Sequence, residues 1–138
     1  MKYLMVTVLF CMISVFVFAN EYPLDTNKDG KYDKWYVYTA GVVESEKSDE
    51  NYDGKIDHIT RFDANGKELT EEIDFNYDGE MDNLYEYSNG RLTFQKIDSN
   101  YDGKIDIWIY IRKGSQIEKY EQDTDFDGVI DKTRTFGL

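Results

Sequence analysis

Short segments of hydrophobic and β-branched residues recur along the chain in pairs. The first member of each pair is rich in aromatic and aliphatic residues, and the second is more polar. Both have the composition of β-strands, and a Gly-containing dipeptide between them, Asn-Gly in two cases, is typical of a tight hairpin turn. The predicted first strands are residues 35–38, 59–62, 84–87 and 107–111, and the predicted return strands are residues 42–47, 67–73, 91–97 and 116–121.

An acidic motif of nine residues, Asp-x-Asn/Asp-x-Asp-Gly-x-x-Asp, precedes each predicted hairpin and occurs once more after the last. Its five glycines are 24, 25, 24 and 25 residues apart, so the chain is a repeat array. We number the copies loop 1 to loop 5 and the positions in each loop from one to nine. The loops are residues 25–33, 49–57, 74–82, 98–106 and 123–131.

Side-chain oxygens occupy positions one, three, five and nine of every loop. A hard cation such as Ca2+ binds about six to eight oxygens, which a short loop supplies from alternate residues, and glycine at position six allows a tight reversal with a positive φ angle. Asp, Asn and Gly also form ordinary turns, but three or four carboxylates within nine residues repel one another without a cation. The predicted Ca2+ ligands are Asp25, Asn27, Asp29, Asp33, Asp49, Asn51, Asp53, Asp57, Asp74, Asn76, Asp78, Asp82, Asp98, Asn100, Asp102, Asp106, Asp123, Asp125, Asp127 and Asp131.

Loop, strand, turn and strand follow one another in each repeat. This order predicts an all-β fold, an antiparallel meander of repeated β-hairpins with the calcium loops along one edge. The pattern leaves open whether the sheet stays open, closes into a barrel or coils as a solenoid. Residues 20–138 are expected to form a single repeat domain.

Residues 1–19 have the pattern of a signal peptide. Lys2 precedes a nearly unbroken apolar run, and small residues precede an expected cleavage site after Ala19. The expected location is therefore periplasmic or secreted, with no stable membrane span after cleavage. An uncleaved N-terminal anchor is the alternative, although the run is short for a span of about 20 residues. Cys11 lies within the run, so the mature chain contains no cysteine.

The charge of the chain argues against nucleic acid as a partner. The sequence has 28 acidic and 16 basic residues, and loss of Lys2 would change the net charge from −12 to −13. Disordered chains are often this acidic, but they are poor in aromatic residues. This chain has 2 Trp, 12 Tyr and 8 Phe residues, so a folded domain with cation ligands explains the acidity better.

The loops are similar to EF-hand loops, which normally close with a bidentate Glu at position twelve. Here that residue is Tyr36, Thr60, Tyr85, Ile109 or Arg134, and Gly-containing turns would interrupt the helices. A helical calcium sensor is therefore the less favoured alternative.

The pattern DxDxDGxxD resembles the calcium loops of integrin-type FG-GAP hairpins, of thrombospondin type-three repeats and of bacterial exported repeat proteins with EF-hand-like loops. The resemblance covers residues 25–131 and implies that positions one, three, five and nine bind Ca2+. The chain departs from FG-GAP repeats in having two strands per repeat, and from thrombospondin repeats in lacking cysteines between the loops.

These observations predict an exported, non-enzymatic calcium-binding protein whose fold Ca2+ stabilises. A regular repeat is unlike an active site, which is a unique constellation, and His58 is the only histidine and has no cysteine partner in the mature chain. The alternative function is a calcium-dependent, adhesin-like module for an extracellular glycan or protein, since exposed aromatic rings on a single-layer sheet would form a docking face. The candidate residues for that face are Trp35, Tyr85, Tyr87 and Trp108.

Overall fold

The computed structural model describes residues 19–137, which form one antiparallel sheet of ten strands. The strands pair in chain order from β1 to β10. The predicted signal peptide lies outside the described residues except for Ala19, which begins β1. The strands are β1 (Ala19–Leu24), β2 (Lys34–Thr39), β3 (Val42–Ser48), β4 (His58–Phe62), β5 (Glu68–Ile73), β6 (Asn83–Ser88), β7 (Arg91–Ile97), β8 (Ile107–Arg112), β9 (Gln116–Gln122) and β10 (Lys132–Thr135).

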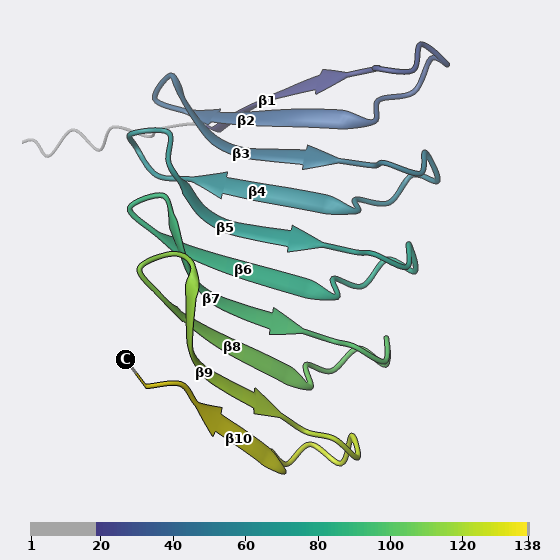
Figure 1. Cartoon of the computed structure of the whole chain (residues 1–138). Helices are drawn as coiled ribbons and strands as arrows, with labels where there is room; N and C mark the ends of the chain where they lie inside the picture. Colours follow the sequence, from purple (N-terminus) through teal and green to yellow (C-terminus); the bar gives the residue numbers. More distant parts are fainter. Residues whose placement is uncertain (1–18, 138) are drawn as a thin grey trace, which may run out of the picture.

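The predicted all-β meander is confirmed, and its sheet is open, with β1 and β10 as the two edge strands. The five acidic loops lie side by side at one end of the strands, and the four short turns lie at the other end (Figure 1). Each of the eight predicted strands agrees with an observed strand to within one residue at either end. The antiparallel pairing follows from the two-strand repeat, because each loop and each turn reverses the chain.

The two edge strands are not among the segments that the hydrophobic pattern predicts. β1 contains Pro23, and β10 is a run of polar residues, so neither has the composition of a strand. Both are exposed along their whole length. They are strands because each pairs with a neighbour, β1 with β2 and β10 with β9.

Three of the four short turns have the backbone conformation of a tight hairpin turn. The φ angles are positive at both central residues of Ala40-Gly41, Asn89-Gly90 and Lys113-Gly114, as a type I′ turn requires. The fourth turn spans residues 63–67 and is wider, and Asp63 closes it by accepting N–H groups of Asn65 and Lys67. Every turn-linked pair of strands also contains a register shift near the turn, a β-bulge that the sequence pattern does not predict.

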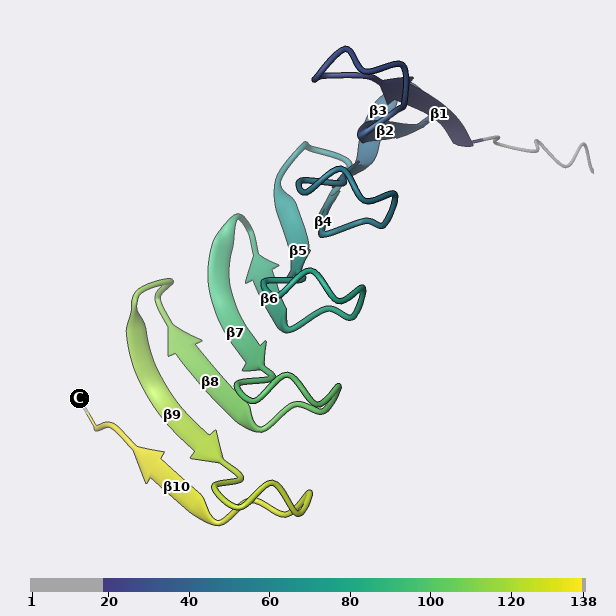
Figure 2. The same cartoon turned by 90° about the vertical axis from the view of Figure 1, so that its right-hand side faces the viewer.

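The sheet forms a single curved layer (Figure 2). Within residues 19–137, no hydrophobic side chain is buried, and most apolar residues of the inner strands are half-buried. Ion pairs bridge strands on these faces, for example Lys47 with Glu21 and Lys96 with Glu86. The described part of the chain contains no helix long and apolar enough to cross a membrane.

A layer without a closed core should tolerate shortening of its apolar residues. Ile109 of β8 pairs with Gln95 and Tyr120 and is half-buried. Replacing a fully buried Ile by Ala costs about 2–5 kcal/mol, so we expect Ile109→Ala to cost about 1–2 kcal/mol, because much of the side chain already contacts water. Urea unfolding in the presence of Ca2+ measures this cost. The more exposed Ile117→Ala is the control and should cost less, and a cost of 3 kcal/mol or more for Ile109→Ala would contradict the single-layer description.

Candidate metal-binding loops

The first and last aspartates of each loop hold the loop closed from opposite ends. In loop 2, Asp49 at position one accepts the N–H groups of Asp53 and Gly54 at N···O distances of 3.1 and 2.8 Å. Asp57 at position nine accepts the N–H groups of Glu50 and Asn51, at 2.6 and 3.1 Å, through its Oδ2 atom alone. The other loops repeat this arrangement, so the spacing of the motif is also the spacing of the turn.

Positions three and five add shorter links within each loop. The Oδ1 atom of Asn51 accepts the N–H of Asp53, and Oδ1 of Asp53 accepts the N–H of Lys55, both at 2.9 Å. The predicted positive φ angle at position six is confirmed in all five loops, with values from 83° to 97°. Only glycine adopts such angles without steric cost.

Position four also has a positive φ angle, which sequence reasoning missed. The angle lies between 61° and 65° in all five loops, although the residue is Lys28, Tyr52, Tyr77, Tyr101 or Phe126. Bulky residues rarely adopt this region. No sequence signal indicates it, because the residues are not turn formers. In loops 1, 3 and 4 the N–H at position four donates to the aspartate at position one.

Stacking of the loops buries their terminal aspartates. At each of the four junctions between neighbouring loops, the aspartate at position nine of one loop and that at position one of the next are both less than 5% exposed. Asp25 and Asp131 lie at the outer ends of the row, where no further loop covers them, and they are not buried. The four buried pairs are Asp33 with Asp49, Asp57 with Asp74, Asp82 with Asp98, and Asp106 with Asp123.

Backbone hydrogen bonds join the two members of each pair. The N–H of Asp49 donates to the carbonyl of Asp33 at 2.8 Å, and the N–H of Asp74 donates to the carbonyl of Asp57 at 2.7 Å. The same bond links the other two pairs, at 2.8 and 2.9 Å. The loops are thus a continuous row in which a backbone hydrogen bond links the last aspartate of one loop to the first aspartate of the next.

Two of these buried carboxylates have an oxygen without a hydrogen-bond partner. Asp57 is 1% exposed and Asp123 is 2% exposed, yet Oδ1 of each accepts no hydrogen bond. A buried, unpaired carboxylate oxygen is costly, so it calls for a proton or a cation.

Each orphaned oxygen belongs to a loop whose carboxylates converge. Oxygen atoms of Asp49, Asp53 and Asp57 lie within 4.8 Å of one another in loop 2, as do those of Asp123, Asp125 and Asp131 in loop 5. These two clusters could hold a metal ion, and all their members are predicted ligands. Oxygen-only donor sets suit hard cations.

Crowding of like charges perturbs the titration of the loops. Burial raises the pKa of Asp82, and the nearby carboxylates of Asp74 and Asp78 raise it further. The carboxylates of Asp127 and Asp131 raise the pKa of Asp125. Both shifts have the direction expected where carboxylates crowd one another, whereas hydrogen bonds within the loops lower the pKa of Asp78 and of Asp131.

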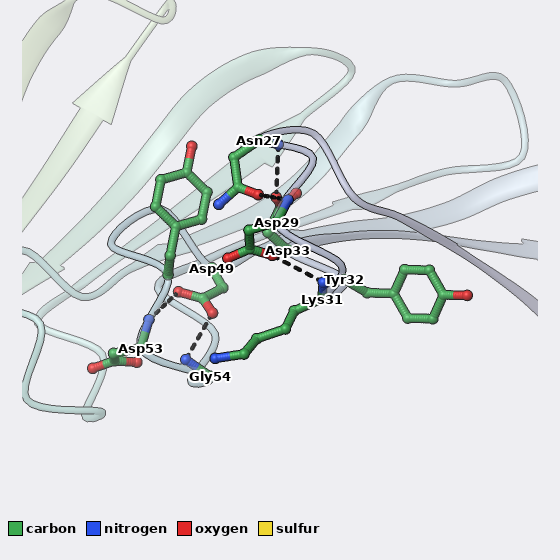
Figure 3. Close-up of a pocket in the computed structure, with 9 residues that line it drawn as sticks. Asn27, Asp29, Lys31, Tyr32, Asp33, Asp49, Asp53 and Gly54 are labelled. Atoms are coloured by element: carbon green, nitrogen blue, oxygen red, sulfur yellow. Dashed lines mark hydrogen bonds between the residues drawn. The ribbon is translucent and has the colours of Figure 1, made fainter.

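A crevice separates loop 1 from loop 2 and is lined by carboxylates of both loops. Asp29 and Asp33 line it from loop 1, and Asp49 and Asp53 line it from loop 2. Lys31 extends from loop 1 toward Gly54 of loop 2 (Figure 3). The junction is therefore a polar cleft in which the two loops share one environment.

The structure separates the four residues of the predicted ligand face. Cross-strand pairing places Trp35 and Trp108 in one row with Lys47 and Lys96. Tyr85 and Tyr87 project from the opposite face, because neighbouring residues of a strand alternate between faces. The hydroxyl of Tyr87 donates to Glu71 at 3.0 Å, and burial, with the Glu71 carboxylate, raises the pKa of Tyr87. The four residues do not form one continuous platform.

His58 lies between two carboxylates on the face of Tyr85. Its Nδ1 atom is 3.2 Å from Glu50 and its Nε2 atom is 2.9 Å from Glu71. These contacts tie loop 2 to β5. His58 is therefore a strand residue whose side chain bridges loop 2 and β5.

No protein-family model matches the chain, and no curated protein matches it. Several solved structures are similar, including these two. One is titled accessory secretory protein 1,2 and 3 in Streptococcus pneumoniae, with 18% identity, a TM-score of 0.49 and coverage of 66% of this chain and 17% of that one. The other is titled GtfA/B complex bound to UDP and GlcNAc, with 16% identity, a TM-score of 0.49 and coverage of 83% and 26%. The chain therefore spans only about a sixth to a quarter of the length of these chains.

Because loops 2 and 3 contact each other, the same Gly→Ala substitution should cost different amounts of unfolding free energy at equivalent glycines. Gly54 and Gly79 have φ angles of 94° and 97°, but a Cβ atom would meet nothing within 4 Å at Gly54, whereas at Gly79 it would lie 2.8 Å from Cδ of Lys55. We expect Gly54→Ala to cost about 1–2 kcal/mol from backbone strain. Gly79→Ala should cost about 1 kcal/mol more, because Lys55 must move and its Nζ atom would give up the hydrogen bond to the carbonyl of Asp78. Urea unfolding at a fixed Ca2+ concentration gives both values. In a Lys55→Ala background the difference should vanish, and equal costs in the parent protein would contradict a contact between loops 2 and 3.

Proposed function

We propose that this protein is an exported, non-enzymatic calcium-binding repeat protein in which Ca2+ bound at the loops stabilises the sheet. The single observation that carries the proposal is the buried Oδ1 atom of Asp57, which has no hydrogen-bond partner and belongs to a converging carboxylate cluster. If loop 2 served only as a turn, Oδ1 of Asp57 would not need to be buried without a partner, because Oδ2 alone already closes the loop.

The residues that would hold the cation in loop 2 are Asp49, Asn51, Asp53 and Asp57, with their equivalents in the other loops. The bound ion would supply positive charge to carboxylates that otherwise repel one another. Ca2+ suits these loops better than Mg2+, because Mg2+ demands near-ideal octahedral geometry and keeps its water. Repetition of one donor set supports a structural role rather than a catalytic one, since an active site is a single constellation.

Calorimetric titration tests the proposal with a matched pair of variants. Asp57→Asn keeps an oxygen that can accept the N–H groups of Glu50 and Asn51, but it removes the charge. We expect it to bind one Ca2+ equivalent fewer than the parent protein, because loop 2 loses a carboxylate that the cation needs. Asp63→Asn is the control, since Asp63 accepts N–H groups in a hairpin turn outside the loops. It should leave the stoichiometry unchanged.

Two results of the same titration would contradict the proposal. The first is an unchanged Ca2+ stoichiometry in Asp57→Asn. The second is equal affinity of the parent protein for Mg2+ and Ca2+, because the loops would then lack the selectivity expected of flexible oxygen ligands.

A further inference from the structure

Neighbouring loops contact one another through the residue at position seven. Nζ of Lys55 in loop 2 donates to the carbonyl of Asp78 in loop 3 at 2.6 Å. Glu80 in loop 3 lies against Gly103 of loop 4 in the same way. Loop 5 has no following loop, and its position seven is Val129, which is 65% exposed. Position seven thus carries a long charged side chain only where there is a next loop to reach.

Contacts in the opposite direction come from the residue at position four. Tyr52 of loop 2 lines the crevice that also contains Asn27 and Asp29 of loop 1. Phe126 of loop 5 lines the equivalent crevice with Asp102 and Asp106 of loop 4. At both ends of the row, the residue at position four therefore lines one crevice together with predicted ligands of the preceding loop.

The identity of position four follows the presence of a preceding loop. It is aromatic in loops 2 to 5 and is Lys28 in loop 1, which no loop precedes. The backbone there has a positive φ angle that bulky residues rarely adopt, so an aromatic residue is not favoured by the turn itself. Phe126 lacks a hydroxyl, so the feature common to these four residues is the surface of the ring.

We propose that the aromatic ring at position four completes the cation site of the preceding loop by excluding water from its carboxylates. This inference rests on the proposed cation binding. Exclusion of water lowers the local dielectric constant and strengthens the attraction between a cation and its ligands. Asp123, whose buried Oδ1 atom has no partner, also lines the crevice between loops 4 and 5, so a carboxylate of the loop 5 cluster lies in the same crevice as Asp102 and Asp106 of loop 4.

One consequence follows for the array. Binding in one loop orders the ring that covers the loop before it, so neighbouring sites fill cooperatively.

The test measures Ca2+ binding at each loop separately, through the NMR signal of the glycine amide in that loop. The N–H of Gly30 donates to Asp25 in loop 1, and that of Gly54 donates to Asp49 in loop 2. Ca2+ titrations followed in 1H–15N spectra therefore give an apparent affinity for each loop. The variant is Tyr52→Asn, because Asn tolerates a positive φ angle, and Tyr52→Phe is the control that keeps the ring.

We expect Tyr52→Asn to weaken Ca2+ binding at Gly30 by about fivefold or more and to affect Gly54 less, while Tyr52→Phe leaves both unchanged. Phe126→Asn should likewise act at Gly103 in loop 4 more than at Gly128 in loop 5. An effect confined to the loop that carries the substitution, an equal effect on both loops, or no effect would overturn the inference. Absence of any Ca2+-induced shift in the parent protein would overturn the proposed function as well, and is distinguishable because it precedes any substitution.

Discussion

The structure depends on the burial of negative charge between stacked loops. Four pairs of aspartates are almost completely removed from water, each pair contributed by two neighbouring loops and linked by a backbone hydrogen bond. Burying a carboxylate costs several kcal/mol unless it is paired or hydrogen-bonded. The loop amides satisfy most of these oxygens, but Oδ1 of Asp57 and of Asp123 remains without a partner. A proton or a cation at these oxygens would offset the cost of burying them.

The rest of the sheet offers little to offset that cost. It is a single layer without a buried hydrophobic side chain among residues 19–137, and its strands are held by backbone pairing, half-buried rings and surface ion pairs. Exposed ion pairs contribute only about 0–1 kcal/mol each. If Ca2+ filled all five loops, the net charge of the chain would change from −12 to −2. Cation binding would then supply the stabilisation that a hydrophobic core supplies elsewhere.

Sequence reasoning recovered the elements with strong local signals. The periodic loops, the eight strands between them and the positive φ angle of the position-six glycines all depend on neighbouring residues, so they could be predicted. The edge strands β1 and β10 could not, because they owe their conformation to a pairing partner rather than to composition. The strained angle at Tyr52 and its equivalents was also missed, because bulky residues rarely adopt a positive φ angle and their side chains give no signal of one.

The candidate site shows the same division. Which residues are candidate ligands follows from the motif, whereas the burial of Asp57 and Asp74 in one junction depends on how successive loops stack. The openness of the sheet was undetermined for a similar reason, since the repeat fixes local pairing but not curvature. The alternation of side chains along each strand assigns Trp35 and Tyr85 to opposite faces only when the pairing register between the strands is known. The bulges and the loop lengths determine that register.

The most direct measurement is the unfolding of the protein with and without cation. Far-ultraviolet circular dichroism is recorded against temperature in EDTA and then in millimolar Ca2+. Ca2+ at 100 times Kd contributes about 2.7 kcal/mol for each site. The account therefore predicts that EDTA lowers the melting temperature by about 10 °C or more, or unfolds the chain, and that Ca2+ restores a β-type spectrum. A metal-free protein with the same spectrum and the same melting temperature would contradict it.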